Sequence, residues 1–241
     1  ETKSVCTSCA TGCNTVIGAR ENIIYRQTPR ENEAVNQSWM CDYGRLNFHD
    51  LNSPDRLLSQ RVNGTDEPEW GKAIAAAAAS LKGFASEQIA LIASGNLTNE
   101  ELFLAAGLIK ALGIGLHDIV PRTGEGDDLL LNADRNANTA GARLLGVADA
   151  NPGSKLAAIA EGVRDGTVKA LIVLGADAAS AGLTVASWSD ETKTATLQEA
   201  LTEEEAQALV GRSVLVADVS ASGTPEAFTM ITAAAAGEAG S

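Results

Sequence analysis

The stretch VCTSCATGCN, residues 5–14, holds three of the four cysteines of a 241-residue chain. They are Cys6, Cys9 and Cys13, and the fourth, Cys41, follows in WMCDYGR. The spacing is C-x2-C-x3-C-x27-C, so one short loop carries three thiols and a fourth comes from a distance. So dense a group in a chain that is otherwise free of cysteine indicates that the four thiols serve one purpose together.

Four cysteines allow two disulfides, a reactive dithiol, a zinc site or an iron–sulfur cluster. Disulfides are disfavoured because 45% of the residues are apolar, enough to form a core without cross-links. A catalytic C-x2-C normally follows a strand of a thioredoxin-like unit, and residues 1–5 are too few to supply that unit. Zinc ligands tend to be paired two and two, whereas a three-plus-one arrangement favours a cubane cluster. The spacing therefore predicts a [4Fe–4S] cluster held by Cys6, Cys9, Cys13 and Cys41, with zinc as the alternative.

The residues between the first three cysteines are all small, and they are Thr7, Ser8, Ala10, Thr11 and Gly12. Their backbone N–H groups are available to hydrogen-bond the cluster sulfurs, which would raise the reduction potential. The first 50 residues contain few large apolar side chains. We therefore expect this domain to depend on its cluster for folding, and the residues from about 66 onward to fold without it.

The overall charge excludes several classes of function. Asp and Glu outnumber Lys and Arg 31 to 18, which gives a net charge of −13. This balance argues against nucleic-acid binding and against an anionic membrane surface, because both need clustered basic residues. No apolar run reaches the roughly 20 residues that cross a bilayer, and the N-terminus lacks the pattern of a signal peptide. We expect a cytoplasmic chain without direct membrane insertion.

The secondary-structure pattern alternates between strands and helices after residue 65. Residues 14–28 predict a hairpin that turns at Arg20–Asn22, and the polar 31–40 stretch predicts a loop that returns to Cys41. Beyond a joint at 51–58, strands are expected in 87–94, 168–175 and 213–219 and helices in 70–82, 98–113, 154–166 and 196–211. Thr98 and Glu101 have the spacing of a capping box, and Gly113 ends that helix. Such alternation predicts a parallel sheet with helices on both faces.

These residues resemble a known family. SVCTSCATGCN and VNQSWMCDYGR are similar to the iron–sulfur domain shared by molybdopterin-dependent oxidoreductases and the large iron–sulfur subunit of bacterial respiratory complex I, NADH:quinone oxidoreductase. The segments SPDRLLSQRVNG, ASGNLTNEELFLAAGLIKALG and KALIVLGAD extend the likeness over most of the chain. The chain looks like a central or truncated portion of such a subunit.

The resemblance implies an α/β fold in two domains. Residues 1–55 would form a small [4Fe–4S] domain with a β-hairpin, and residues 56–241 a parallel-sheet domain of the molybdopterin oxidoreductase type. It also implies an electron-transfer role beside flavin- and iron–sulfur-carrying subunits of an NADH dehydrogenase, peripheral to the inner membrane. The activity would then belong to the complex, and we expect no catalytic residue in this chain.

Three positions separate the electron carriers of this family from its catalysts. Tyr43 stands where the molybdenum enzymes usually carry a lysine. Gly124, followed by Glu125, stands where formate dehydrogenases have the metal-ligating Cys or selenocysteine and then His. Asp177 and Ala178 replace the Asn and Pro of a pterin-binding turn. We therefore expect the pterin site to be lost, with a molybdopterin-dependent oxidoreductase such as formate dehydrogenase as one alternative and a zinc-stabilised scaffold as another.

The remaining polar features indicate structure and not chemistry. His49 and His117 are the only histidines, and a lone histidine without named partners is expected to be a polar surface or loop residue. The stretch TGEGDD, residues 123–128, lacks the ligand periodicity of a calcium-binding loop. We expect it to be a solvated acidic loop.

Overall fold

The computed structural model describes residues 1–52, 59–63, 65–127 and 129–176, together with the backbone of four later strands. The chain forms two compact units. The first, here called the cluster unit, contains residues 1–56 and 121–141. The second, called the α/β unit, contains residues 57–120 and 142–241. The predicted boundary at 55/56 falls in the 53–58 stretch, outside the described residues, and stays a prediction.

The cluster unit is built on a three-stranded antiparallel sheet in the order β1-β2-β3. The strands are β1 (Thr2–Val5), β2 (Asn14–Arg20) and β3 (Ile23–Pro29). Glu21 and Asn22 join β2 to β3 with positive φ of 54° and 62°, the backbone conformation of a tight hairpin turn. The predicted hairpin is therefore present, and β1 adds an edge strand that the sequence pattern does not predict.

Two short helices follow the loop that leaves β3. They are α1 (Asp42–Leu46) and α2 (Phe48–Leu51). The polar loop before them contains a single isolated bridge, between Asn32 and Gln37. This loop leads directly into Cys41, the residue that caps α1, as the sequence predicts.

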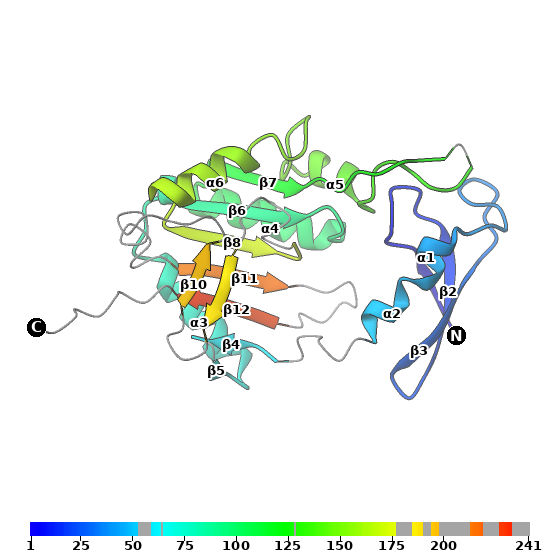
Figure 1. Ribbon diagram of the computed structural model, residues 1–241, viewed down its shortest axis with the longest axis horizontal. Helices are drawn as coiled ribbons and strands as arrows, with labels where there is room; N and C mark the ends of the chain where they lie inside the picture. The colour runs from blue at the N-terminus through cyan, green and yellow to red at the C-terminus, as the bar shows by residue number, and fades with distance from the viewer. Residues whose placement is uncertain are drawn as a thin grey trace, which may run out of the picture. The chain divides into compact units, whose positions relative to one another are not determined.

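The α/β unit contains a seven-stranded sheet in the order β5-β4-β12-β11-β8-β6-β7 (Figure 1). Its strands are β4 (Arg61–Val62), β5 (Thr65–Asp66), β6 (Ile89–Ser94), β7 (Leu116–Val120), β8 (Ala170–Leu174), β11 (Ser213–Asp218) and β12 (Ala227–Thr232). The run from β11 through β8 and β6 to β7 is parallel, as predicted. The pairs β11–β12 and β4–β5 are antiparallel, so the sheet as a whole is mixed.

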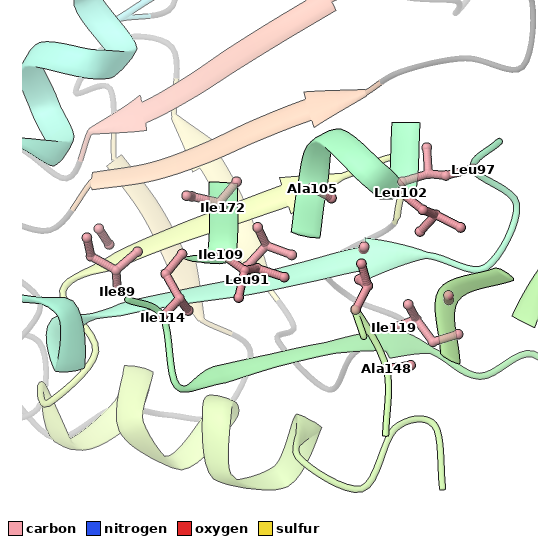
Figure 2. Close-up of a cluster of buried hydrophobic side chains, with 14 residues drawn as sticks. Ile89, Leu91, Leu97, Leu102, Ala105, Ile109, Ile114, Ile119, Ala148 and Ile172 are labelled. Carbon is pink, nitrogen blue, oxygen red and sulfur yellow. The ribbon is translucent and has the colours of Figure 1, made fainter. Parts of the chain in front are cut away.

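Strand β6 is at the centre of the apolar core, and every one of its residues is buried. Ile89, Leu91 and Ala93 belong to a buried cluster that includes residues of α4 (Asn99–Leu112), as Figure 2 shows. Ala90 and Ile92 belong to a second cluster with α6 (Leu156–Asp165). Because successive side chains of a strand point to opposite faces, α4 and α6 cover opposite faces of the sheet. This explains why the strand reads as an unbroken apolar run.

The predicted helix signals of this unit are also present. Thr98 accepts the N–H of Glu101, and the Glu101 carboxylate accepts the N–H of Thr98, so the capping box is formed. Gly113 ends α4 with a φ of 66°. Helix α3 (Trp70–Leu81) and a 3₁₀ turn (Ser86–Gln88) precede β6, and α5 (Thr139–Leu144) follows β7.

One element differs from its prediction. The sequence predicts a helix over 196–211, but Thr196 and Leu197 lie in β10 (Thr194–Leu197), which pairs with β9 (Val185–Ser189). Their β-branched and apolar side chains suit a strand, and the rest of that predicted helix lies outside the described residues.

Candidate metal centre

The loop that carries three cysteines connects β1 to β2. Cys6 follows the last residue of β1 and Cys13 precedes the first residue of β2, and Val5 pairs with Asn14 across the two strands. The N–H of Cys6 donates to the carbonyl of Cys13 at 2.8 Å, which closes the loop at its base. Gly12, at a φ of +65°, makes the turn that a residue with a side chain would strain to make. Antiparallel pairing therefore sets the separation of the first and third cysteines.

Cys41 is supplied by a later segment of the same unit, after β3. It is the N-cap of α1, and its Sγ accepts the N–H of Gly44 at 3.4 Å. The N–H···S contact leaves the sulfur oriented by backbone rather than by packing, and Cys41 is less buried than the other three cysteines.

A buried asparagine organises the loop that delivers Cys41. The Asn36 side-chain carbonyl accepts the N–H of Asn14, the residue after Cys13, at 2.9 Å. Its amide nitrogen donates to the carbonyls of Arg30, Gln37 and Trp39. One side chain thus links the end of the three-cysteine loop to the backbone just before the fourth cysteine. Sequence reasoning missed Asn36, because nothing local distinguishes it from the polar residues around it.

Gly44 lies where the two cysteine-bearing segments meet. A Cβ at this position would lie 2.8 Å from the Sγ of Cys6 and 3.6 Å from the Sγ of Cys41. Both sulfurs therefore lie within contact distance of one point, and only glycine leaves that point free. Cys6, Cys13 and Met40 also form a small buried cluster of their own.

The thiol of Cys13 is affected both by its burial and by the other three cysteines. Burial, and after it the proximity of Cys6, Cys9 and Cys41, raises the pKa of Cys13 to about 11. Without a metal, Cys13 would therefore keep its proton at neutral pH, because a thiolate would be poorly solvated and close to three other sulfurs. A bound cation is what makes four such thiolates compatible. The structure brings the sulfurs of Cys6 and Cys41 together at Gly44 and places Cys6 and Cys13 in one buried cluster, and the full set of four ligands stays a prediction.

This donor set fits a soft metal. Four thiol sulfurs suit iron–sulfur clusters and zinc, and exclude the oxygen-seeking cations. Among the described residues, no three His, Cys, Asp or Glu side chains are grouped as ligands of a single metal ion. A cubane cluster gives each thiolate its own iron, so its ligands need not converge on one point.

Residues 121–141 also contact the cysteine loop. The N–H of Ala10 donates to the carbonyl of Asp134 at 2.9 Å, and the Thr11 hydroxyl donates to the carbonyl of Leu130 at 2.7 Å. The N–H of Gly12 donates to the carbonyl of Cys9. The N–H groups of Ala10 and Gly12 are thus engaged with carbonyls, which corrects the expectation that they are available to the cluster sulfurs.

The positions that separate carriers from catalysts have structural surroundings of their own. Tyr43 is 52% exposed, and its hydroxyl accepts from Arg122. A Cβ at Gly124 would lie 2.7 Å from the Nε of Arg135, which is the far end of a flexible side chain. Asp177 and Ala178 lie outside the described residues.

The two histidines are not equivalent. His49 is exposed on α2 and stacks on Phe48, in agreement with the expected surface position. His117 differs from the expectation of a surface or loop residue, because it lies on β7, is partly buried, and has its Nδ1 3.0 Å from the carbonyl of Val147. That contact gives His117 a structural partner.

Residues 1–49 match the family described as NADH-ubiquinone oxidoreductase NDSU1/NuoG-like, 4Fe-4S domain. The predicted resemblance is confirmed. Because the matching family is a 4Fe-4S domain, the prediction of a [4Fe–4S] cluster as the cofactor is confirmed with it.

Several proteins are similar over about half of the chain. The alpha subunit of the NADPH-Fe(3+) oxidoreductase of Geobacter sulfurreducens is 34% identical over 128 residues, which is 51% of this chain and 15% of that protein. Subunit 3 of the NADH-quinone oxidoreductase of Thermus thermophilus is 32% identical over 126 residues, 51% of this chain and 16% of that protein. Relatives from Staphylococcus aureus, whose names carry formate dehydrogenase as a provisional assignment, are 29% identical over 126 residues.

The matched part of this chain therefore spans about one sixth or less of the length of these relatives. Within the described ranges, no helix has both the length and the apolar character needed to cross a membrane.

Proposed function

We propose that Cys6, Cys9, Cys13 and Cys41 are the four ligands of one [4Fe–4S] cluster. The observation that carries this proposal is the convergence of the β1–β2 loop and the start of α1 at Gly44, where a Cβ would touch the sulfurs of Cys6 and Cys41. Three of the four thiols are buried at 3–4% exposure, so the cluster would be shielded from solvent on the side of the loop. Cys41 is the more exposed ligand, so electrons would enter and leave the cluster on the side of Cys41.

The chain then acts as an iron–sulfur electron-transfer subunit of an NADH dehydrogenase of the complex I type. The cluster takes and gives single electrons, and the chain itself performs no bond-making step. Its partners are subunits that carry flavin and further iron–sulfur clusters, and the complex lies at the inner membrane with this chain on the cytoplasmic side. The proposal is supported by the match of residues 1–49 and by the similarity to a subunit of an NADH-quinone oxidoreductase.

The α/β unit is, in this proposal, a molybdopterin oxidoreductase-like domain of residues 56–241 without a functional pterin site. The parallel run β11-β8-β6-β7 with helices on both faces supports that type of domain. Gly124 has no side chain that could ligate a metal, which supports the loss of a metal ligand there.

Anaerobic purification with analysis of iron, sulfide, zinc and molybdenum on one sample tests the proposal. We expect about four irons and four sulfides per chain, with a paramagnetic signal after reduction. One zinc per chain without visible absorption would contradict the electron-carrier proposal and favour a zinc-stabilised scaffold.

A molybdopterin-dependent oxidoreductase such as formate dehydrogenase is the second candidate, favoured by the Staphylococcus aureus relatives. Expression in a host that makes molybdopterin separates the two. The electron-carrier proposal expects no molybdenum and no formate-dependent dye reduction above that of a Cys6→Ser control. Stoichiometric molybdenum would favour the second candidate.

A further inference from the structure

Residues 121–127 and 129–141, here called the strap, form a loop with a hydrogen-bonded ladder of its own. The N–H of Arg135 donates to the carbonyl of Arg122 at 2.7 Å, and the N–H of Gly124 donates to the carbonyl of Ala133 at 3.0 Å. Near the far end of the loop, the N–H of Asp127 donates to the carbonyl of Leu131. The strap is therefore an ordered hairpin-like loop, although its sequence has no strand or helix periodicity.

A single carboxylate shapes the tip of the strap. Oδ1 of Asp127 accepts the N–H groups of Leu129, Leu130 and Leu131 at 2.5–2.9 Å. These donors, that of Leu130 foremost, hold the pKa of the Asp127 carboxyl below its usual range. The turn that they define presents the carbonyl of Leu130, which is the acceptor for the Thr11 hydroxyl.

The strap contacts both segments that carry the proposed ligands. On one side it holds Ala10 and Thr11, which lie between Cys9 and Cys13, through the carbonyls of Asp134 and Leu130. On the other side it reaches α1, where the guanidinium of Arg135 lies 5.7 Å from the centre of the Tyr43 ring, a cation–π distance. The Arg122 guanidinium also donates to the Tyr43 hydroxyl at 3.5 Å. The green segment after β7 is drawn beside the blue N-terminal loop in Figure 1.

The strap has little apolar burial with which to stay ordered alone. Among its described residues before Thr139, only Asn136 is buried, and Leu129 is 76% exposed. Ordering a loop of this length costs conformational entropy that its own side chains do not offset. The contacts with the cysteine loop and with Tyr43 must therefore contribute to its order, and by linkage the strap must stabilise those two segments in return.

We propose that the strap is a positioning element for the metal centre: it fastens the Cys9–Cys13 turn and the start of α1 to each other and slows loss of the bound cluster. That the bound group is a [4Fe–4S] cluster rests on the proposed function. That the strap and a bound metal stabilise each other does not depend on which metal it is. The strap contributes no ligand, so its effect should appear in the rate of metal release and in its own order, and not in the number of irons bound at the start.

Thr11→Val tests the contact with the cysteine loop, because it removes the hydroxyl while preserving shape. Thr28→Val is the matched control, since the Thr28 hydroxyl donates to the carbonyl of Val16 inside the hairpin of the same unit and not to the strap. We expect the visible absorption of anaerobic Thr11→Val protein to decay under an iron chelator about two- to tenfold faster than that of wild type, the effect of one hydrogen bond. Thr28→Val should stay within twofold of wild type.

Asp127 provides a rescue experiment. Asp127→Ala removes the acceptor at the tip and should speed cluster loss as Thr11→Val does. Asp127→Asn keeps an oxygen for the three N–H groups and should restore a rate near that of wild type. A merely destabilised protein would not recover in this way.

Limited trypsin digestion of the full chain tests the reverse direction, whatever metal is bound. Removing the metal from wild type with a chelator should expose the bonds after Arg122 and Arg135, while cleavage after Lys110 in α4 stays unchanged. Two results would refute the positioning role of the strap. One is unchanged resistance to trypsin after Arg122 and Arg135 once the metal is removed, and the other is equal decay rates for Thr11→Val and Thr28→Val. A wild-type protein with zinc in place of iron would refute the iron–sulfur cluster of the proposed function. The trypsin result would then decide whether the strap and the metal depend on each other.

Discussion

The α/β unit buries Leu91, Ile92 and Ile172 completely, whereas the buried cluster of the other unit consists of Cys6, Cys13 and Met40. Each fully buried aliphatic side chain contributes about 1.5–3 kcal/mol to stability, so burial alone can stabilise the α/β unit. The cluster unit relies on hydrogen bonds from side chains such as Asn36 and Thr11 and, in our proposal, on metal ligation. The two units therefore differ in what would unfold them.

Removing a proposed ligand should have the largest effect. Cys41→Ala is expected to abolish iron binding and the protease resistance of residues 1–56, because folding of a small metal domain depends on its metal. The strap should lose protection with them, and the α/β unit should keep its thermal unfolding transition. Iron content, mass spectrometry of tryptic fragments and calorimetry measure the three effects.

Met40→Leu is the matched control, because it preserves the volume of the residue next to Cys41 and should keep the cluster. A Cys41→Ala protein that retains both iron and N-terminal protection would show that Cys41 is not a ligand.

Creating a cavity in the α/β core should have the next largest effect, and on the other unit only. Leu91→Ala is expected to lower the free energy of unfolding of the α/β unit by about 2–5 kcal/mol, measured by urea denaturation. Leu104→Ala, at a position 70% exposed on α4, should change it by less than about 0.5 kcal/mol. Loss of iron from folded Leu91→Ala protein would mean that the two units are not independent in stability.

Filling the space at Gly44 tests the geometry of the metal centre. Gly44→Ala places a methyl group 2.8 Å from the sulfur of Cys6 and should destabilise the loaded cluster unit by about 1–3 kcal/mol, the usual cost of overpacking. The measurement is the rate of iron release to a chelator. Gly18→Ala serves as control, because its methyl group would meet only the flexible side chain of Arg26; equal rates for the two variants would argue against the convergence at Gly44.

The smallest effect should come from the cap of α4. Thr98→Ala removes one partner of the capping box and should cost the α/β unit about 0.5–2 kcal/mol, seen as a lower thermal transition. Thr98→Ser should keep most of that stability, and neither variant should change iron content. A Thr98→Ala protein as stable as wild type would show that solvent replaces the cap at no cost.

Much of this architecture could be predicted because its signals are local. The hairpin of β2 and β3, the capping box at Thr98 and the apolar run of β6 each depend on neighbouring residues, and each is present. The antiparallel pair β4–β5 could not be predicted, since a two-residue strand carries almost no periodic signal. Only the length of the unpatterned stretch between β7 and α5 could have drawn attention to the strap, because long loops without structure are uncommon in compact domains.

The sequence by itself determined the chemistry of the centre, because thiol type and C-x2-C-x3-C spacing are properties of a short segment and of one later cysteine. Only the tertiary structure decided that Gly44 must lack a side chain, that Asn36 links two loops, and that residues 121–141 fasten the cysteine loop. Each of these depends on atoms that are far apart along the chain and meet only after folding. A backbone carbonyl such as that of Leu130 is present at every position and acquires its role only when folding places a donor beside it.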